Sequence, residues 1–99
     1  MLRVLIITAL TYLCGVAFSQ HQNILITTTS SPNEPSIIIN PKKTHQLYGG
    51  ANIDTYFYSD DYGYTWLEGT LESQEHGVWG DPVLLCDNTG AFYFFHLSN

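Results

Sequence analysis

From residue 34 onward, apolar and aromatic residues fall into short runs that are separated by turn-forming residues. These runs cover 36–39, 46–51, 55–58, 65–70, 81–86 and 91–97. They are rich in β-branched and aromatic side chains, which favour strands, and the segments between them contain Gly, Pro, Asn, Asp and Ser, which favour turns. The pattern therefore predicts an all-β chain, with four antiparallel strands up to residue 70 and two more after residue 80.

Several of these runs are apolar on both sides of the expected strand. Residues 36–39 read Ser-Ile-Ile-Ile without alternation, and 81–86 is also apolar at successive positions. In the last run two aromatic side chains point one way and three apolar side chains point the other way, namely Phe92 and Phe94 against Tyr93, Phe95 and Leu97. Strands of this kind are covered on both faces. We therefore expect each sheet to lie between neighbouring layers.

The N-terminus has the three parts of a secretory signal peptide. Met1-Leu2-Arg3 is a short basic region, 4–16 is almost entirely apolar, and Ala17-Phe18-Ser19 offers small residues for cleavage after Ser19. The apolar run is shorter than the ~20 residues that a spanning helix needs. The sequence predicts a signal peptide over 1–19 and a secreted protein, extracellular or periplasmic, with no membrane span after cleavage. A polar linker follows over 20–33, in which 24–26 is a possible edge strand.

Removal of the signal peptide changes the charge and the cysteine content. It leaves two lysines, Lys42 and Lys43, against nine carboxylates, a net charge of −7. An acidic surface argues against nucleic acid and anionic membranes as partners, because both bind basic surfaces. Cys86 becomes the only cysteine, so no intramolecular disulfide is expected. We interpret Cys86 as a small apolar residue on a strand.

The most informative stretch is the turn that follows the run 55–58. Asp61 brings a short carboxylate that accepts backbone N–H groups, and Gly63 adopts a positive φ without a steric clash. Trp66 is large enough to cover the turn. Together these residues predict a hairpin in which the chain reverses between 59 and 66.

The same turn resembles a known repeat. Ser59-x-Asp61-x-Gly63-x-Thr65-Trp66 is similar to the Asp-box, or bacterial neuraminidase repeat, at all five defining positions. In that family the box joins the third and fourth strands of a β-propeller blade, on the outer rim and away from the active site. The resemblance therefore implies a structural role for these five residues.

The resemblance also implies a domain organisation. It gives an antiparallel four-stranded blade over 34–72 and the start of a second blade over 81–99, within a six-bladed, sialidase-like propeller. Residues 33–36 and 80–83 resemble the corresponding segments of secreted bacterial sialidase-like propellers. A propeller closes with about 4–8 blades, and the 80 residues from Gln20 to Asn99 supply about one and a half. We expect the chain to be the N-terminal part of a longer protein whose remaining blades close the fold.

The catalytic set implied by the resemblance is not in this chain. Sialidases use an arginine triad, a tyrosine nucleophile paired with a glutamate, and an aspartate as acid and base. No arginine remains after signal removal, and residues 34–37 read Glu-Pro-Ser-Ile where the family has its first triad arginine. We assign no catalytic residue and expect this chain alone to be inactive.

Three functions stay open at this stage. The first is part of an exo-sialidase-like or glycosyl-hydrolase-like protein. The second is a non-catalytic propeller that binds glycan or protein at the cell surface. The third is a short secreted protein that assembles by pairing its open strand edges.

The remaining candidate residues are aromatic or titratable. Tyr62 and Trp79, with Tyr64 as a weaker candidate, lie in or beside loops and are candidates for glycan binding, whereas aromatic residues within strands are usually core. Asp81 precedes a strand, and we interpret it as a loop-closing hydrogen-bonding residue. The pair Glu75-His76 lacks the third and fourth ligands that zinc needs, and the other histidines are scattered. The sequence predicts no metal site and no cofactor.

Overall fold

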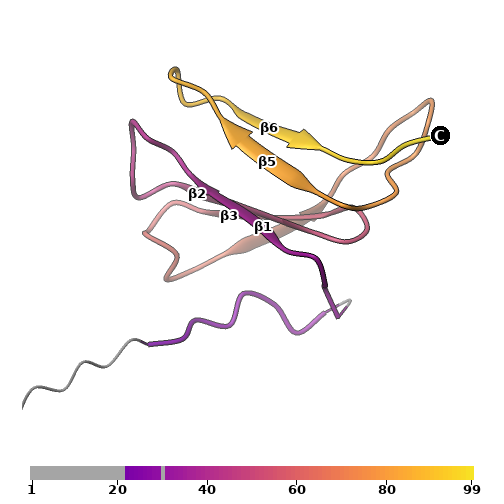
Figure 1. Ribbon diagram of the computed structural model, residues 1–99. Coiled ribbons are helices and arrows are strands. Elements are labelled where there is room, and N and C mark those ends of the chain that lie inside the picture. Colours follow the sequence, from indigo (N-terminus) through magenta and orange to yellow (C-terminus); the bar gives the residue numbers. More distant parts are fainter. Residues whose placement is uncertain (1–21, 30) are drawn as a thin grey trace, which may run out of the picture.

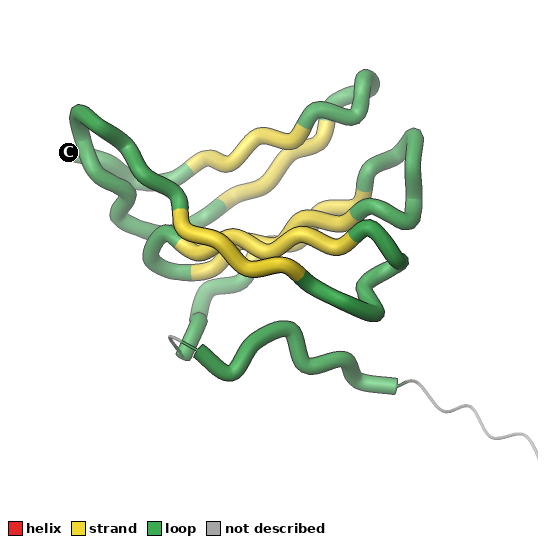
Figure 2. Tube along the Cα trace, turned by 180° about the vertical axis from the view of Figure 1, so that it is seen from behind, coloured by secondary structure: helices red, strands yellow, loops and turns green. Residues whose placement is uncertain are grey.

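A computed structural model describes residues 22–29 and 31–99, which form two antiparallel sheets (Figures 1 and 2). The first sheet has the strand order β1-β2-β3-β4 and the second pairs β5 with β6. The strands are β1 (Ser36–Ile39), β2 (Leu47–Ala51), β3 (Thr55–Ser59), β4 (Leu67–Thr70), β5 (Val83–Cys86) and β6 (Phe92–Phe95). The predicted all-β architecture is confirmed. The predicted signal peptide, 1–19, lies outside the described residues.

Strand boundaries differ from the sequence prediction at one informative place. The run 65–70 was expected to be a strand throughout, but β4 begins only at Leu67. Thr65 and Trp66 instead form hydrogen bonds within the preceding turn. The Thr65 backbone N–H donates to Asp61, and the Trp66 indole N–H donates to the Gly63 carbonyl. Hydrogen bonds from side chains to the backbone compete with the hydrogen bonds of strand pairing. At residues 65 and 66 the turn contacts form, and β4 therefore begins two residues later than predicted.

One buried region lies between the two sheets, and a second lies on the other face of the four-stranded sheet, around Ala51 and Phe57. In Figure 1 the β5–β6 sheet lies against one face of the four-stranded sheet, and β5 is packed beside β1 and β2. Leu84 is buried there, and its N–H donates to the Ser36 hydroxyl at 3.2 Å. The rings of Phe92 and Tyr48 have centroids 4.0 Å apart. These contacts fix the second sheet on the first.

A glycine permits the close approach of the two sheets. A Cβ atom on Gly50 would lie 2.6 Å from Phe94 and 3.3 Å from Pro82. Carbon atoms in ordinary contact are about 3.5–4.0 Å apart. The absence of a side chain at Gly50 therefore allows the Phe94 ring to lie directly on β2.

The N-terminal segment runs across the opposite face of the four-stranded sheet (Figure 1). Ile26, Pro32 and Pro35 line a small apolar cavity with Phe57, which is only 4% exposed. The hydroxyls of Thr27 and Thr29 donate to the Glu68 carboxylate at 2.6 and 2.7 Å. The possible edge strand over 24–26 does not form, since residues 22–27 have no strand pairing.

The expected cover on both faces of each sheet is incomplete within the described residues. Ile37 and Ile39 are 59% and 50% exposed. The outer face of the β5–β6 sheet carries five exposed apolar side chains, namely Val83, Leu85, Tyr93, Phe95 and Leu97. Phe92 and Phe94 do point to the opposite side from these, as expected, but none of the residues 22–29 and 31–99 covers the outer face.

We predict that Gly50→Ala destabilises the packing of the two sheets. The added methyl group would push Phe94 and Pro82 away, which should lower the free energy of unfolding by about 1–3 kcal/mol. Gly49→Ala is the matched control, because its Cβ would meet Phe57 at a more tolerable 3.3 Å on the other face. Urea unfolding of both variants measures the difference. Equal destabilisation by the two substitutions would contradict the assigned role of Gly50.

Candidate functional site

The 59–66 turn joins β3 to β4 and is held by a network of short side chains. Ser59 is only 1% exposed and lies at the end of β3. Its hydroxyl donates to Asp61 Oδ1 at 2.8 Å and accepts the Gly63 N–H at 2.8 Å. One buried hydroxyl therefore connects the strand end to two residues of the turn.

Asp61 closes the other half of the turn. Its Oδ1 atom accepts the Thr65 backbone N–H at 2.9 Å, and its Oδ2 atom accepts the Thr65 hydroxyl at 2.6 Å. These bonds favour the ionised carboxylate, so the Thr65 hydroxyl and then the Thr65 N–H lower the pKa of Asp61 below its usual value. The carboxylate thus bridges the end of β3 and the start of the returning segment.

Gly63 and Trp66 complete the turn. Gly63 has a φ of 87°, a left-handed conformation that glycine adopts readily. The indole N–H of Trp66 donates to the Gly63 carbonyl at 2.9 Å. The indole ring packs against Gly63, because a Cβ atom added there would lie 3.5 Å from it. All five residues of the Asp-box pattern therefore take part in one local network.

A second aspartate-centred turn connects β5 to β6. Asp87 Oδ1 accepts the Thr89 hydroxyl at 2.7 Å, and Asp87 Oδ2 accepts the Tyr93 hydroxyl at 2.8 Å. The hydroxyls of Thr89 and Tyr93, and then the N–H groups of Ala91 and Thr89, hold the pKa of Asp87 far below its usual value. The sequence predicts a turn over 87–90 but does not predict the hydrogen bond from the Tyr93 hydroxyl to Asp87. The only sequence signal for this bond is an aspartate at the start of the turn and a tyrosine on the returning strand.

The two glycan-binding candidates lie at opposite ends of the four-stranded sheet. Tyr62 is 66% exposed in the 59–66 turn, next to the β1–β2 turn, where its ring centroid is 5.9 Å from that of His45. Trp79 is 58% exposed beside Gly80, which packs against Asn52 in the β2–β3 turn. The structure therefore does not bring Tyr62 and Trp79 into one site. Tyr64 is also exposed.

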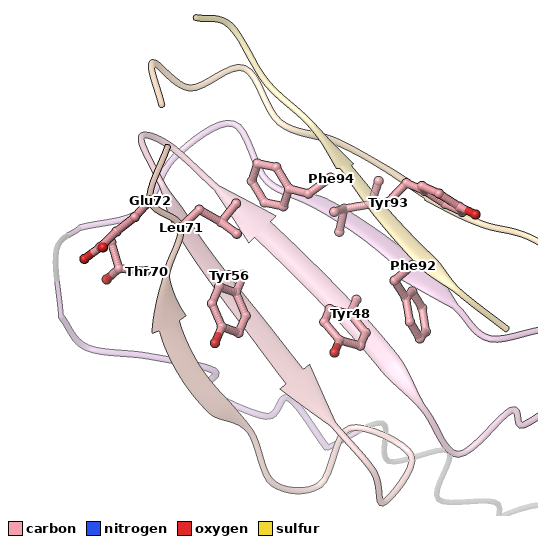
Figure 3. A pocket seen from close by; sticks show the side chains of 9 residues that line it. Tyr48, Tyr56, Thr70, Leu71, Glu72, Phe92, Tyr93 and Phe94 are labelled. Carbon is pink, nitrogen blue, oxygen red and sulfur yellow. The ribbon is translucent and has the colours of Figure 1, made fainter. Parts of the chain in front are cut away.

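A wedge of about 510 Å³ opens between the two sheets (Figure 3). Tyr48 and Tyr56 line it from the four-stranded sheet, and Phe92 and Phe94 line it from β6. Glu72 contributes a carboxylate at the end of β4. The wedge continues the packed interface between the sheets toward β3 and β4, which the two-stranded sheet does not reach.

The remaining titratable residues form no metal-binding cluster in the described chain. Within residues 22–29 and 31–99, no three His, Cys, Asp or Glu side chains are grouped so as to hold a metal ion. Asp81 is exposed, and its backbone N–H donates to Asn52 Oδ1 at 2.6 Å. Partial burial and then the charge of Asp87 raise the pKa of the Cys86 thiol, which makes it a poor nucleophile at neutral pH.

Comparison of the chain with protein-family models, with curated proteins and with solved structures finds no significant match. The part of the chain that the structure describes also contains no helix with the length and hydropathy of a membrane span.

We predict that Ser59→Ala destabilises the protein by about 1–3 kcal/mol, because it leaves the Gly63 N–H without its buried acceptor. Ser73→Ala is the matched control: Ser73 lies in an exposed loop and, among the described residues, accepts the His76 N–H alone, at 3.3 Å, so its loss should change stability by no more than about 0.5 kcal/mol. Chemical denaturation provides the measurement. A neutral Ser59→Ala substitution would show that the hydroxyl does not hold the turn.

Acidification should weaken the fold through the two aspartate-centred turns. A carboxyl group whose pKa is lowered in the folded state stabilises the protein above its unfolded pKa of about 3.9, and this contribution is lost as pH falls below that value. We expect the unfolding midpoint in urea to fall as pH decreases below about 4. Asp61→Asn should be less stable than the parent at pH 6 but should lose less on acidification. A parent and a variant with identical pH dependence would contradict the assigned role of Asp61.

Proposed function

We propose that the chain is part of a secreted Asp-box β-propeller of the sialidase-like or glycosyl-hydrolase-like kind, in which the 59–66 turn is structural. The observation that carries this proposal is the position and bonding of the turn. It joins the third and fourth strands of a four-stranded antiparallel sheet, as an Asp-box does in a blade. Ser59, Asp61 and Thr65 are bonded to one another rather than turned toward a ligand.

The layer arrangement supports the same proposal. A propeller stacks four-stranded sheets around an axis, so that each sheet is covered by its neighbours. Here β5 lies against β1 and β2, while the outer face of the β5–β6 sheet is apolar and exposed in the described chain. A further blade against this face would remove those side chains from water.

In this proposal the chain contributes framework and no catalytic group. Residues 22–29 and 31–99 contain no arginine, so the arginine triad of a sialidase has no member among them. The same observation favours the second candidate function, a non-catalytic propeller that binds glycan or protein at a cell surface. The exposed Tyr62 and Trp79 then act as separate contact residues, because they lie at opposite ends of the sheet.

The reading frame of the transcript on both sides of this sequence tests the proposal. We expect further Ser-x-Asp-x-Gly-x-Thr-Trp boxes at the spacing of one blade, about 40–50 residues. A frame without any further box would contradict the propeller.

The residues encoded in the other blades, together with an activity assay of the secreted protein, distinguish the enzyme from the non-catalytic binding protein. An enzyme requires three arginines and a Tyr/Glu pair in the other blades, and the secreted protein should then release the fluorophore from 4-methylumbelliferyl sialic acid. A propeller that lacks these residues should leave this substrate intact and bind instead to a glycan array. In that case, we expect Tyr62→Ala and Trp79→Ala to reduce binding independently of each other.

A further inference from the structure

The two sheets begin with the same local structure. Glu34 has a φ of 50° and is followed by Pro35 and then by β1. Asp81 also has a φ of 50° and is followed by Pro82 and then by β5. A positive φ is uncommon for residues other than glycine. The same unusual arrangement, an acidic residue in this conformation with proline after it, therefore precedes the first strand of each sheet.

A hydrogen bond at the same place closes both strand pairs. Asn33 lies three residues before β1, and its carbonyl accepts the N–H of Asn52, which follows β2, at 3.1 Å. Gly80 lies three residues before β5, and its carbonyl accepts the N–H of Leu97, just beyond β6, at 3.0 Å. The pairs β1–β2 and β5–β6 are therefore two copies of one structural unit.

The segments that precede the two copies correspond to each other. Before the second copy the chain forms β4, the outermost strand of the first sheet, and residues 71–82 lead from it to β5. Before the first copy lies the segment 24–29, which reads Ile-Leu-Ile-Thr-Thr-Thr and is β-branched at all but one position. Such residues favour strands, yet this segment has no strand pairing with any described residue. The repeat therefore indicates that 24–29 is the counterpart of β4 in a neighbouring sheet.

The position of the segment agrees with this correspondence. The hydroxyls of Thr27 and Thr29 donate to Glu68 in β4, the outermost strand. Glu68 is opposite Phe57 in the pairing of β3 with β4, so both side chains lie on the face away from the β5–β6 sheet (Figure 1). Ile26 lines the apolar cavity beside Phe57. The segment therefore reaches β4 on the face where a neighbouring sheet would place its own outermost strand.

We propose that residues 24–29 form the outermost strand of the neighbouring blade and pair antiparallel with its third strand, which comes from the remaining blades of the protein. This inference rests on the proposed propeller, and it adds the partner of the N-terminal segment. The inner strands of that blade would cover Ile37 and Ile39, which are half exposed and lie on the same side of the sheet as Phe57.

Amide hydrogen exchange tests the pairing in the protein encoded by the complete reading frame, with the 99-residue chain as the reference. Successive residues of an antiparallel strand direct their N–H groups to opposite edges. An outermost strand is paired on one side, so every second amide over 24–29 should be protected. At those positions exchange should be at least about tenfold slower in the complete protein than in the 99-residue chain.

Proline substitutions at two neighbouring positions provide a matched pair of variants. The N–H groups of Ile24 and Leu25 have no partner among the described residues, so Ile24→Pro and Leu25→Pro should leave the thermal midpoint of the 99-residue chain unchanged. In the complete protein, one of the two N–H groups faces the third strand. Proline at that position removes a ladder hydrogen bond and should lower the midpoint by about 2–4 °C, whereas proline at the other position is tolerated.

The outcomes separate this inference from the proposed function. A reading frame without further Asp-boxes would remove both together. A frame with further boxes whose product shows no alternating protection over 24–29, or has the same midpoint with either proline, would overturn the strand pairing and leave the propeller in place.

Discussion

The Asp61 carboxylate holds the connection on which β4 depends. It accepts the Ser59 hydroxyl at 2.8 Å on one side, and the Thr65 N–H and hydroxyl at 2.9 and 2.6 Å on the other. Hydrogen bonds to an ionised acceptor are stronger than those between neutral groups. Apart from the two threonine hydroxyls that donate to Glu68, the side chains of β4 give little support, since Leu67 is 69% exposed and Gly69 has no side chain. Backbone pairing with β3 and the 59–66 turn are therefore the main constraints that keep β4 in the sheet.

The two faces of the four-stranded sheet are stabilised in different ways. On one face, the aromatic side chains of β6 pack closely on β2 because Gly50 leaves room for Phe94. On the other face, the segment before β1 covers Phe57 and bonds to Glu68 through two threonine hydroxyls. The close packing is concentrated near β1 and β2. Toward β3 and β4 the sheets separate, and this separation leaves the wedge lined by Tyr48 and Tyr56.

The strands were predictable from the sequence because each is a short apolar or aromatic run between turn residues. The 59–66 turn was also predictable, because a short carboxylate at Asp61 followed two residues later by Gly63 is typical of a tight turn. Long-range placement was not predictable in the same way. The wedge depends on the packing of the two sheets, and the separation of Tyr62 from Trp79 depends on strand direction and loop length.

The expected covering of both sheet faces shows a further limit of sequence patterns. The isoleucines of β1 and the aromatic residues of β6 indicate burial, and a pattern cannot specify which segment provides it. In the described chain Ile37 and Phe95 are 59% and 55% exposed. The Asp87–Tyr93 bond was missed for a related reason, because it joins a turn to a strand position that the turn sequence does not define.

Amide hydrogen exchange in the parent chain and in Asp61→Asn tests most directly whether the carboxylate of the 59–66 turn holds β4. Local opening raises the exchange rate only where the native hydrogen bonds are lost. We predict that Asp61→Asn speeds exchange at residues 67–70 while the amides that pair β1 with β2 keep their protection. Unchanged protection of residues 67–70 in the variant would contradict the account.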